Sequence, residues 1–235
     1  MKTAPETCPD CEKRKPLCIC EDLAPPFDSK LRVLILQHPQ EPDKELGSAR
    51  LSCMQLKNSQ LSIGLSWPNL SVAWFGKGEA APREESLQPK NWACIYLGNA
   101  GGLSQKLDPS IMATVPTGGE QLIFVDKKGN PLHDQEDARR HLQGIVILDG
   151  TWSQAKTLWW RNAWLLKCRR AVLLPRSASL YGSLRKEPRK ECLSTIESVA
   201  LTLDSLNESP EIGQVLRSSF RRLLQKARDE RKANQ

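Results

Sequence analysis

Four cysteines near the amino terminus are spaced like the ligands of a metal ion. The segment "CPDCEKRKPLCIC" gives the spacing Cys8-x2-Cys11-x6-Cys18-x-Cys20. Four thiolates this close together can close a tetrahedral zinc site, and the metal would hold together a segment with little apolar core of its own. Because cysteine is scarce, this clustering favours a metal site over four ordinary reduced thiols. We therefore predict a structural zinc knuckle.

A second group of reactive residues follows an apolar run, in "GIVILDGTW" (144–152). Asp149 ends a predicted strand, Gly150 lets the chain turn, and Thr151 is placed to cap a helix that begins near Trp152. The positive end of this helix would keep Asp149 ionised. A carboxylate at the carboxyl edge of a strand can serve as a general base or as an orienting acceptor. The alternative is that Asp149 only caps the helix beside Thr151.

Polar residues also follow the first apolar run. His38 and Glu41, in "LQHPQEP", stand at the carboxyl end of a predicted strand, where open α/β sheets bind ligands. Arg50 could add a contact to a phosphate or a carboxylate. The alternative is a proline-rich turn with exposed polar side chains.

Positive charge is concentrated in the last third of the chain. Residues 1–150 have a net charge of −2, whereas residues 151–235 have a net charge of +9. This asymmetry favours a polyanionic partner such as RNA, because clustered Lys and Arg release counterions from a phosphate backbone. Arg185, Lys186 and Arg189 are candidates for phosphate contacts. A solvated surface that keeps the protein in solution is the alternative.

Short apolar runs predict the elements that position these residues. Each run has four to six residues, many of them β-branched or aromatic, as in strands covered on both faces. The predicted strands are 31–36, 71–75, 93–97, 122–125, 144–148 and 171–174. Several of the segments between them are long enough for helices, which predicts an α/β fold with a mostly parallel sheet.

Three helices are predicted around these strands. Thr151 with Gln154, and Ser194 with Glu197, match the capping box that begins a helix. The tail has one apolar helical face, formed by Ile212, Val215, Leu216, Phe220, Leu223 and Leu224. Three tryptophans on and just beyond the first helix are expected in the core rather than as base-stacking platforms: Trp159, Trp160 and Trp164.

The length of 235 residues suits one main core with a small appendage. We predict a cysteine-rich knuckle over residues 1–22 and a catalytic domain over residues 30–235. No apolar stretch is long enough to span a bilayer, and the amino-terminal segment lacks a signal-peptide hydrophobic run. We therefore expect a cytoplasmic protein with reduced thiols and no membrane partner. The oligomeric state is not predicted.

Taken together, these motifs resemble the DTW-domain family, the tRNA-uridine aminocarboxypropyltransferases. The resemblance covers nearly the whole chain. It rests on the cysteine knuckle, "HPQE" (38–41), "DGTW" (149–152) and "LYGSLRKEP…LSTIE" (180–197), in this order. It implies a SPOUT-like fold, in which the carboxyl-terminal part of the sheet forms a trefoil-knot pocket for S-adenosylmethionine (SAM).

The resemblance also implies an activity: transfer of the 3-amino-3-carboxypropyl group of SAM to N3 of a uridine in tRNA, leaving methylthioadenosine. The implied catalytic residues are Asp149, Thr151 and Trp152. The implied SAM-binding residues are Leu97, Leu148, Leu174, Tyr181, Ser194 and Thr195. The tRNA-binding candidates are His38, Glu41, Arg50, Arg185, Lys186 and Arg189.

Three alternatives stay open at this point. The first is a SAM-dependent RNA methyltransferase on the same scaffold, because a sulfonium makes all three attached carbons electrophilic. The second is a non-catalytic zinc-knuckle protein that binds RNA. The third is an enzyme of the same kind that acts on ribosomal RNA.

Overall fold

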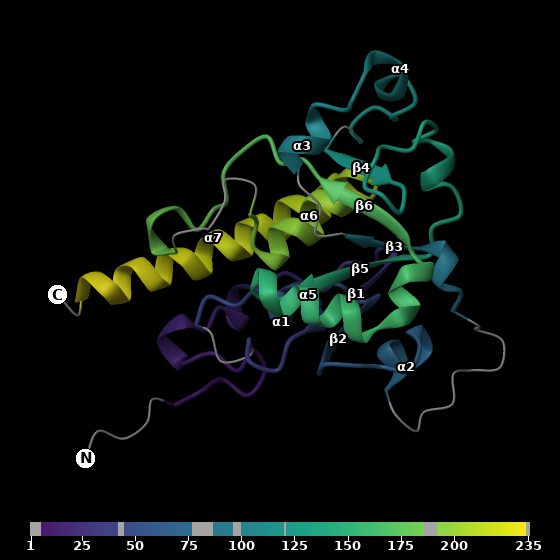
Figure 1. Cartoon of the computed structure of the whole chain (residues 1–235). Helices are drawn as coiled ribbons and strands as arrows, with labels where there is room; N and C mark the ends of the chain where they lie inside the picture. Colours follow the sequence, from purple (N-terminus) through teal and green to yellow (C-terminus); the bar gives the residue numbers. More distant parts are fainter. Residues whose placement is uncertain are drawn as a thin grey trace.

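The computed structural model describes residues 6–41, 45–76, 87–95, 100–119, 121–185 and 192–233. Within these ranges the chain forms a six-stranded sheet with helices on both faces (Figure 1). The strands are β1 (Arg32–Gln37), β2 (Ser59–Ile63), β3 (Trp92–Ile95), β4 (Leu122–Val125), β5 (Gly144–Asp149) and β6 (Arg169–Leu173).

The helices differ greatly in length. The α-helices are α1 (Ala49–Cys53), α2 (Leu70–Phe75), α3 (Ala100–Ser104), α4 (Pro109–Met112), α5 (Trp152–Arg161), α6 (Thr195–Ser205) and α7 (Pro210–Ala233). The short 3-10 helices are η1 (Lys15–Leu17), η2 (Cys20–Asp22), η3 (Pro89–Asn91), η4 (Asp137–Arg139), η5 (Ala163–Lys167) and η6 (Gly182–Leu184). In the described part of the chain, no helix has both the length and the apolar character needed to cross a membrane.

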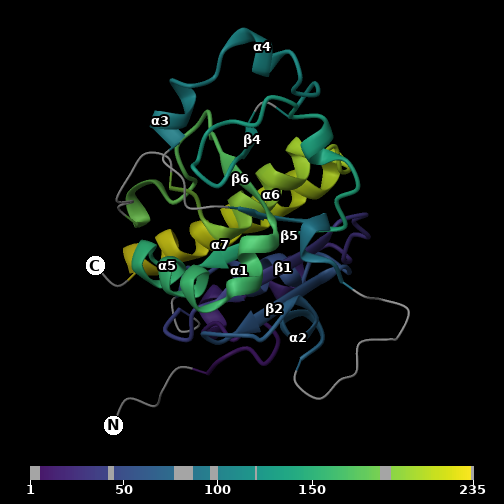
Figure 2. The same cartoon turned by 45° about the vertical axis from the view of Figure 1, so that its right-hand side comes forward.

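The strands lie in the order β2-β1-β5-β3-β6-β4. All neighbouring pairs are parallel except β4 and β6, so the prediction of a mixed α/β fold with a mostly parallel sheet is confirmed. Strands that come late in the sequence lie between earlier ones: β5 separates β1 from β3, and β6 separates β3 from β4. Figures 1 and 2 both place α3 and α4 at the β4 end of the molecule and α2 at the β2 end.

The central strands send alternate side chains into two separate cores, as period-two strands must. On one face, Ile35 of β1 and Ile147 of β5 pack in the core that contains α1, α6 and α7. On the other face, Leu36 and Val146 pack with α2 and α5. The same alternation places the side chain of Asp149, the last residue of β5, on the sheet face that packs against α6.

The predicted strand at 71–75 is wrong, because this segment belongs to α2. Its apolar residues have the length of a strand, but the Asn69 side chain accepts a hydrogen bond from Val72 N and so caps a helix. Leu70 and Ala73, three residues apart, form its buried face. The local cap therefore decides a conformation that the apolar run alone leaves ambiguous.

The predictions also missed β2, which has the sequence "SQLSI". Only two of its five residues are apolar, and every residue of the strand is at least partly exposed, because it is an edge strand. Edge strands need less apolar character than the central strands, so an apolar-run criterion does not find them.

The three predicted helices are confirmed as α5, α6 and α7. Helix α7 buries Ile212, Leu216, Phe220, Leu223 and Leu224, while Val215 is half-buried. Figure 1 shows the carboxyl end of α7 beside the amino-terminal segment.

Ion pairs and apolar contacts fasten this amino-terminal segment to α7. The Arg14 guanidinium donates two hydrogen bonds to the Glu230 carboxylate, at 2.6 and 2.8 Å. Leu17 and Ile19 are buried in the core that α7 shares with the sheet. The knuckle therefore packs on the main body, and its separation into domains 1–22 and 30–235 stays a prediction.

Gly144 opens β5 at a point without room for a side chain. A Cβ there would lie 2.7 Å from the Trp92 ring and 2.8 Å from the Arg32 carbonyl oxygen. We expect Gly144→Ala to lower the free energy of unfolding by about 1–3 kcal/mol, because the backbone of β1 would have to move. Urea denaturation measures this change. Ser153→Ala, at an exposed position of α5, should cost less than about 0.5 kcal/mol, and equal losses in the two variants would contradict the argument.

Candidate functional site

The Asp149 carboxylate joins two strands and a helix at the carboxyl edge of the sheet. Its Oδ2 atom accepts a hydrogen bond from Gln37 Nε2 of β1 at 2.6 Å. Its Oδ1 atom accepts a hydrogen bond from the Thr195 hydroxyl, at the first residue of α6. Gln37 and Asp149 are direct partners in the register of β1 and β5, which puts both side chains on the same face. The backbone therefore holds the carboxylate in a defined orientation.

Burial raises the pKa of Asp149, while the hydrogen bonds from Thr195 and then Gln37 act against this increase. The nearby Glu41 carboxylate raises this pKa further, and the Arg185 guanidinium lowers it. The sequence predicts that the end of α5 keeps Asp149 ionised, whereas burial acts in the opposite direction and raises the pKa of this carboxyl. A carboxylate with a raised pKa is a better proton acceptor than an exposed aspartate, as a general base requires.

The turn after Asp149 depends on Gly150 and Thr151. Gly150 has a φ of +152°, and a Cβ there would lie 2.8 Å from Gln154 Cβ. Thr151 Oγ1 accepts a hydrogen bond from Gln154 N, and Gln154 Oε1 accepts one from Thr151 N at 2.7 Å. The predicted capping box is confirmed. Thr151 caps α5, and the Asp149 carboxylate does not. The carboxylate accepts its hydrogen bonds from Gln37 and Thr195 instead.

Glu197 fastens the loop after β6 to the start of α6. Its carboxylate accepts hydrogen bonds from Ser194 N at 3.0 Å and from Ser194 Oγ at 2.6 Å. It also accepts hydrogen bonds from Ser179 Oγ at 2.6 Å and from Leu180 N at 2.8 Å. The predicted capping box is present here too. Its glutamate therefore does more than cap the helix, because it also fixes a distant loop next to Thr195.

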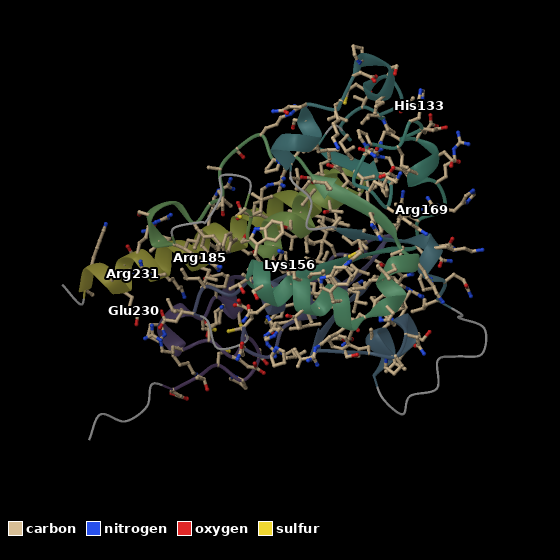
Figure 3. The ribbon with its side chains drawn as sticks, in the orientation of Figure 1. His133, Lys156, Arg169, Arg185, Glu230 and Arg231 are labelled. Carbon is tan, nitrogen blue, oxygen red and sulfur yellow. The ribbon has the colours of Figure 1, made fainter. Side chains whose placement is uncertain are left out.

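The loop between β6 and α6 is anchored through Tyr181. The Tyr181 ring is buried and packs edge-on against Phe220, with the ring centroids 5.2 Å apart. Its hydroxyl donates to Leu46 O at 3.3 Å. The Arg185 guanidinium lies 5.2 Å from the centre of the same ring, and Figure 3 shows Arg185 alongside α7. Tyr181 thus supports the loop that carries Arg185.

The structure brings His38 and Glu41 to the same edge as Asp149. His38 N donates to the Asp149 carbonyl oxygen at 3.0 Å, and Glu41 N donates to His38 O at 2.9 Å. Glu41 is buried. Arg50 lies on α1 and forms an ion pair with Glu12 of the knuckle, at 2.8 Å. His38 and Glu41 therefore belong to the Asp149 environment, whereas Arg50 links α1 to the amino-terminal segment.

Two of the predicted SAM-binding leucines are positioned elsewhere. Leu148 packs in the core of α2 and α5, on the sheet face opposite to Asp149. Leu174 packs in the small core under α3. Leu97, Lys186 and Arg189 lie outside the described residues. The functional roles of these five residues stay predictions.

The sequence did not predict that Gln37 contacts Asp149 or that Glu197 contacts the loop after β6. Gln37 had a detectable signal, because it is polar at the end of an apolar strand and in phase with Val33 and Ile35. Ser179 had no such signal. Its contact with Glu197 joins residues 18 apart through the path of the loop.

The four amino-terminal cysteines come together as their spacing indicated. Their sulfur atoms all lie within 4.8 Å of one another, and Cys8 Sγ and Cys20 Sγ are 3.8 Å apart. Four sulfurs bound to a tetrahedral zinc at about 2.3 Å would be about 3.8 Å from each other. Hydrogen bonds from the backbone N–H groups of Cys11 and Asp10 lower the pKa of Cys8 to about 7, which favours a thiolate ligand. The cluster is compatible with a structural metal.

Comparison with known proteins gives a match over nearly the whole chain. The DTW domain matches residues 5–228. The chain is 25% identical, over 92% of its length, to tRNA-uridine aminocarboxypropyltransferase 2 of Macaca fascicularis and covers 61% of that protein. It is 28% identical, over 89% of its length, to the protein of the same name in Drosophila melanogaster and covers 70% of it. For tRNA-uridine aminocarboxypropyltransferase A of Arabidopsis thaliana, the identity is 23% over 88% of this chain and 74% of the relative. No solved structure matches significantly.

Removing the charge of Glu197 should loosen the loop that it holds. In Glu197→Gln, an amide NH2 replaces an acceptor and faces the Ser194, Ser179 or Leu180 donors. We expect the free energy of unfolding to fall by about 1–3 kcal/mol, because buried donors lose their partner. Amide hydrogen exchange should also become faster in residues 179–185.

The matched control for this variant is Glu211→Gln, at an exposed position in the first turn of α7. It should leave exchange in the loop unchanged. Unchanged exchange in both variants would show that the carboxylate does not fasten the loop.

Proposed function

The chain belongs to the DTW domain family, and from this premise we propose that it transfers the 3-amino-3-carboxypropyl group of SAM to N3 of a uridine in tRNA. The names of the relatives that match most of its length support this activity. The observation that carries the proposal is the Asp149 carboxylate, fixed by Gln37 and Thr195 at the edge where open α/β sheets bind ligands. The chain spans 61% of the macaque relative, so the activity named for that protein is a proposal for this chain.

The residues around Asp149 fit the chemistry of SAM. Each oxygen of Asp149 accepts one hydrogen bond and keeps a second lone pair for an ammonium group or for a proton. The carboxylates of Asp149 and Glu41 make this edge suitable for a positively charged donor. When bound, SAM supplies a sulfonium that makes the carbon of its aminocarboxypropyl chain electrophilic.

In the proposed mechanism, Asp149 accepts the N3 proton of the uridine or orients the group that does. Gln37 and Thr195 hold the carboxylate so that its free lone pairs point to one place, which makes catalysis mainly a matter of positioning. Thr151 fixes the turn behind Asp149 by capping α5, and Trp152 opens the same helix. The uridine must leave its stack to reach this edge, and we propose that Trp152 lies beside it.

We further propose that the sheet carries a SPOUT-like trefoil knot with the SAM pocket. The insertion of β5 and β6 between earlier strands supports this topology, because the chain returns twice to the middle of the sheet. SAM would lie against the loops after β3 and β6 and the start of α6. The residues proposed to bind it are Leu97, Leu148, Leu174, Tyr181, Ser194 and Thr195. Leu148 and Leu174 would take part through backbone groups, since their side chains pack in the cores.

The same loops provide the proposed grip on tRNA. Arg185 lowers the pKa of Asp149, and we propose that it binds a phosphate of the nucleotide that carries the reacting base. Lys186 and Arg189 follow it in the sequence and are proposed to extend the contact. His38 and Glu41 would contact the nucleotide from the β1 side, and Arg50 would contact the tRNA beside the knuckle.

Asp149→Asn should remove the transfer activity and keep the fold. We expect kcat/KM to fall at least about 100-fold, because an amide cannot accept the proton. Burial raises the pKa of folded Asp149, so its ionisation costs stability as the pH rises above about 4. At pH 7 the variant should therefore be at least as stable as the parent protein in urea. The control, Asp137→Asn at an exposed position, should retain full activity; near-normal turnover of Asp149→Asn would remove Asp149 from the mechanism.

The product of the reaction tests the proposed function directly. The protein is incubated with tRNA and with SAM labelled either in the methyl carbon or in the aminobutyrate carbons. Mass spectrometry of the nucleosides should find the aminobutyrate label in a modified uridine and no methyl label. Methyl label would indicate a methyltransferase, product in ribosomal RNA alone would change the substrate, and tRNA binding without SAM binding would leave only an RNA-binding protein.

We propose that the cysteine cluster holds one structural zinc ion through Cys8, Cys11, Cys18 and Cys20. Metal analysis of the purified protein should give about one zinc per chain. Removing it with a chelator should lower the melting temperature, because Leu17 and Ile19 of the knuckle are part of the main core. A metal content near zero, with all four knuckle thiols titratable, would refute the zinc site.

A further inference from the structure

Helix α5 exposes a large aromatic side chain to solvent. Trp159 and Trp164 are buried, at 6% and 5% exposure, as predicted for core residues. Trp160 is 75% exposed, so its prediction as a core residue is wrong. It lies opposite the buried face formed by Ala155, Leu158 and Trp159. Among the large apolar side chains that the described residues expose, which are Ile63, Trp160 and Leu166, Trp160 is the most exposed.

Trp160 continues a row of side chains that starts at the candidate site. Trp152, Lys156 and Trp160 are four residues apart, so they lie on successive turns of one side of α5. We call these three residues the α5 stripe. The Lys156 ammonium is 5.9 Å from the centre of the Trp152 ring, and Figure 3 shows Lys156 on α5 near the middle of the molecule. Over eight residues the stripe runs about 12 Å along the helix from the turn that holds Asp149.

The segment of the sequence that carries the α5 stripe is rich in positive charge. Residues 150–186 contain eight Lys and Arg and no Asp or Glu. Arg161 and Lys167, beside and beyond Trp160, are both exposed. Aromatic rings among cations are the pattern of single-stranded nucleic acid sites, where bases stack on the rings and the cations follow the backbone.

We propose that the α5 stripe binds the unpaired tRNA segment next to the modified uridine, with one base stacked on Trp160 and a phosphate at Lys156. Stacking on an indole accepts any base, because every base has a π face, so the stripe guides the strand without reading its sequence. The identity of the RNA rests on the proposed function. Binding of single-stranded RNA by the stripe can be measured without catalysis.

The test compares three variants of the full-length protein in binding to unmodified tRNA. Trp160→Ala should raise the dissociation constant roughly 5- to 100-fold, because stacking is lost. Trp160→Phe should restore most of the affinity. It should also remove part of the tRNA-induced quenching of tryptophan fluorescence, which locates the base on this ring. Lys156→Gln should make the negative slope of log K against log salt concentration less steep by about 0.7, the value for one phosphate contact on a single strand.

Ile63→Ala, which removes another exposed apolar side chain (44% exposed), is the matched control and should bind tRNA as the parent protein does. SAM binding, measured without tRNA, should be the same in all variants. If Trp160→Ala binds tRNA normally, or if Ile63→Ala loses as much affinity, the proposal is overturned. A changed oligomeric state in Trp160→Ala with normal tRNA affinity would also overturn it and would assign Trp160 to an interface between copies.

Measuring tRNA binding and product formation together shows which of the two proposals fails. Weaker tRNA binding by Trp160→Ala, in a protein that forms no aminocarboxypropyl product, would support the stripe and refute the transfer reaction. Normal binding by the variant, in a protein that forms the product, would do the reverse.

Discussion

The geometry of the proposed site depends on one half-buried carboxylate at the place where three elements meet. Asp149 ends β5, accepts a hydrogen bond from the end of β1 through Gln37, and accepts another from the start of α6 through Thr195. A half-buried carboxylate without partners would be destabilising, so these two donors offset the cost of placing the charge here. The same contacts set the distance between the sheet and α6, so that the geometry of the proposed site follows from the way the layers pack.

A second constraint is the loop between β6 and α6. In its described residues, 174–185 and 192–194, η6 is the only regular element, yet Glu197 holds the first part of the loop and Tyr181 holds the part before Arg185. Both anchors are buried or half-buried groups with several partners. A loop of this kind can present Arg185 next to Asp149 without the entropic cost that a flexible loop would incur on binding.

Much of the fold could be predicted from local signals. Short apolar runs predict five of the strands, and local capping residues predict two of the helices. These elements are β1, β3, β4, β5 and β6, and α5 and α6. The segment at 71–75 could not be assigned by its apolar character, since the deciding cap at Asn69 lies outside the run. The edge strand β2 was missed for the opposite reason, because its half-exposed position requires little apolar character.

Part of the candidate site could also be predicted from local signals, and part could not. Asp149 could be predicted because a strand, a glycine and a capping threonine mark its position along the chain. The partners of Asp149 depend on strand order and register, which no local pattern contains; the pairing of Gln37 with Asp149 follows from β1 and β5 being neighbours across 112 residues. Exposure is equally a property of the assembled layers. Of two adjacent tryptophans with the same composition around them, Trp159 is buried and Trp160 is in solvent.

The contact between Arg14 and Glu230 spans 216 positions of the sequence. During synthesis the first of these residues leaves the ribosome long before the second exists. The cysteine segment can collect its four sulfurs early, but Arg14 has no Glu230 to bind until α7 has been made. The newly made chain therefore keeps the α7-facing side of its cysteine segment uncovered until α7 has been made, and α7 then closes over it.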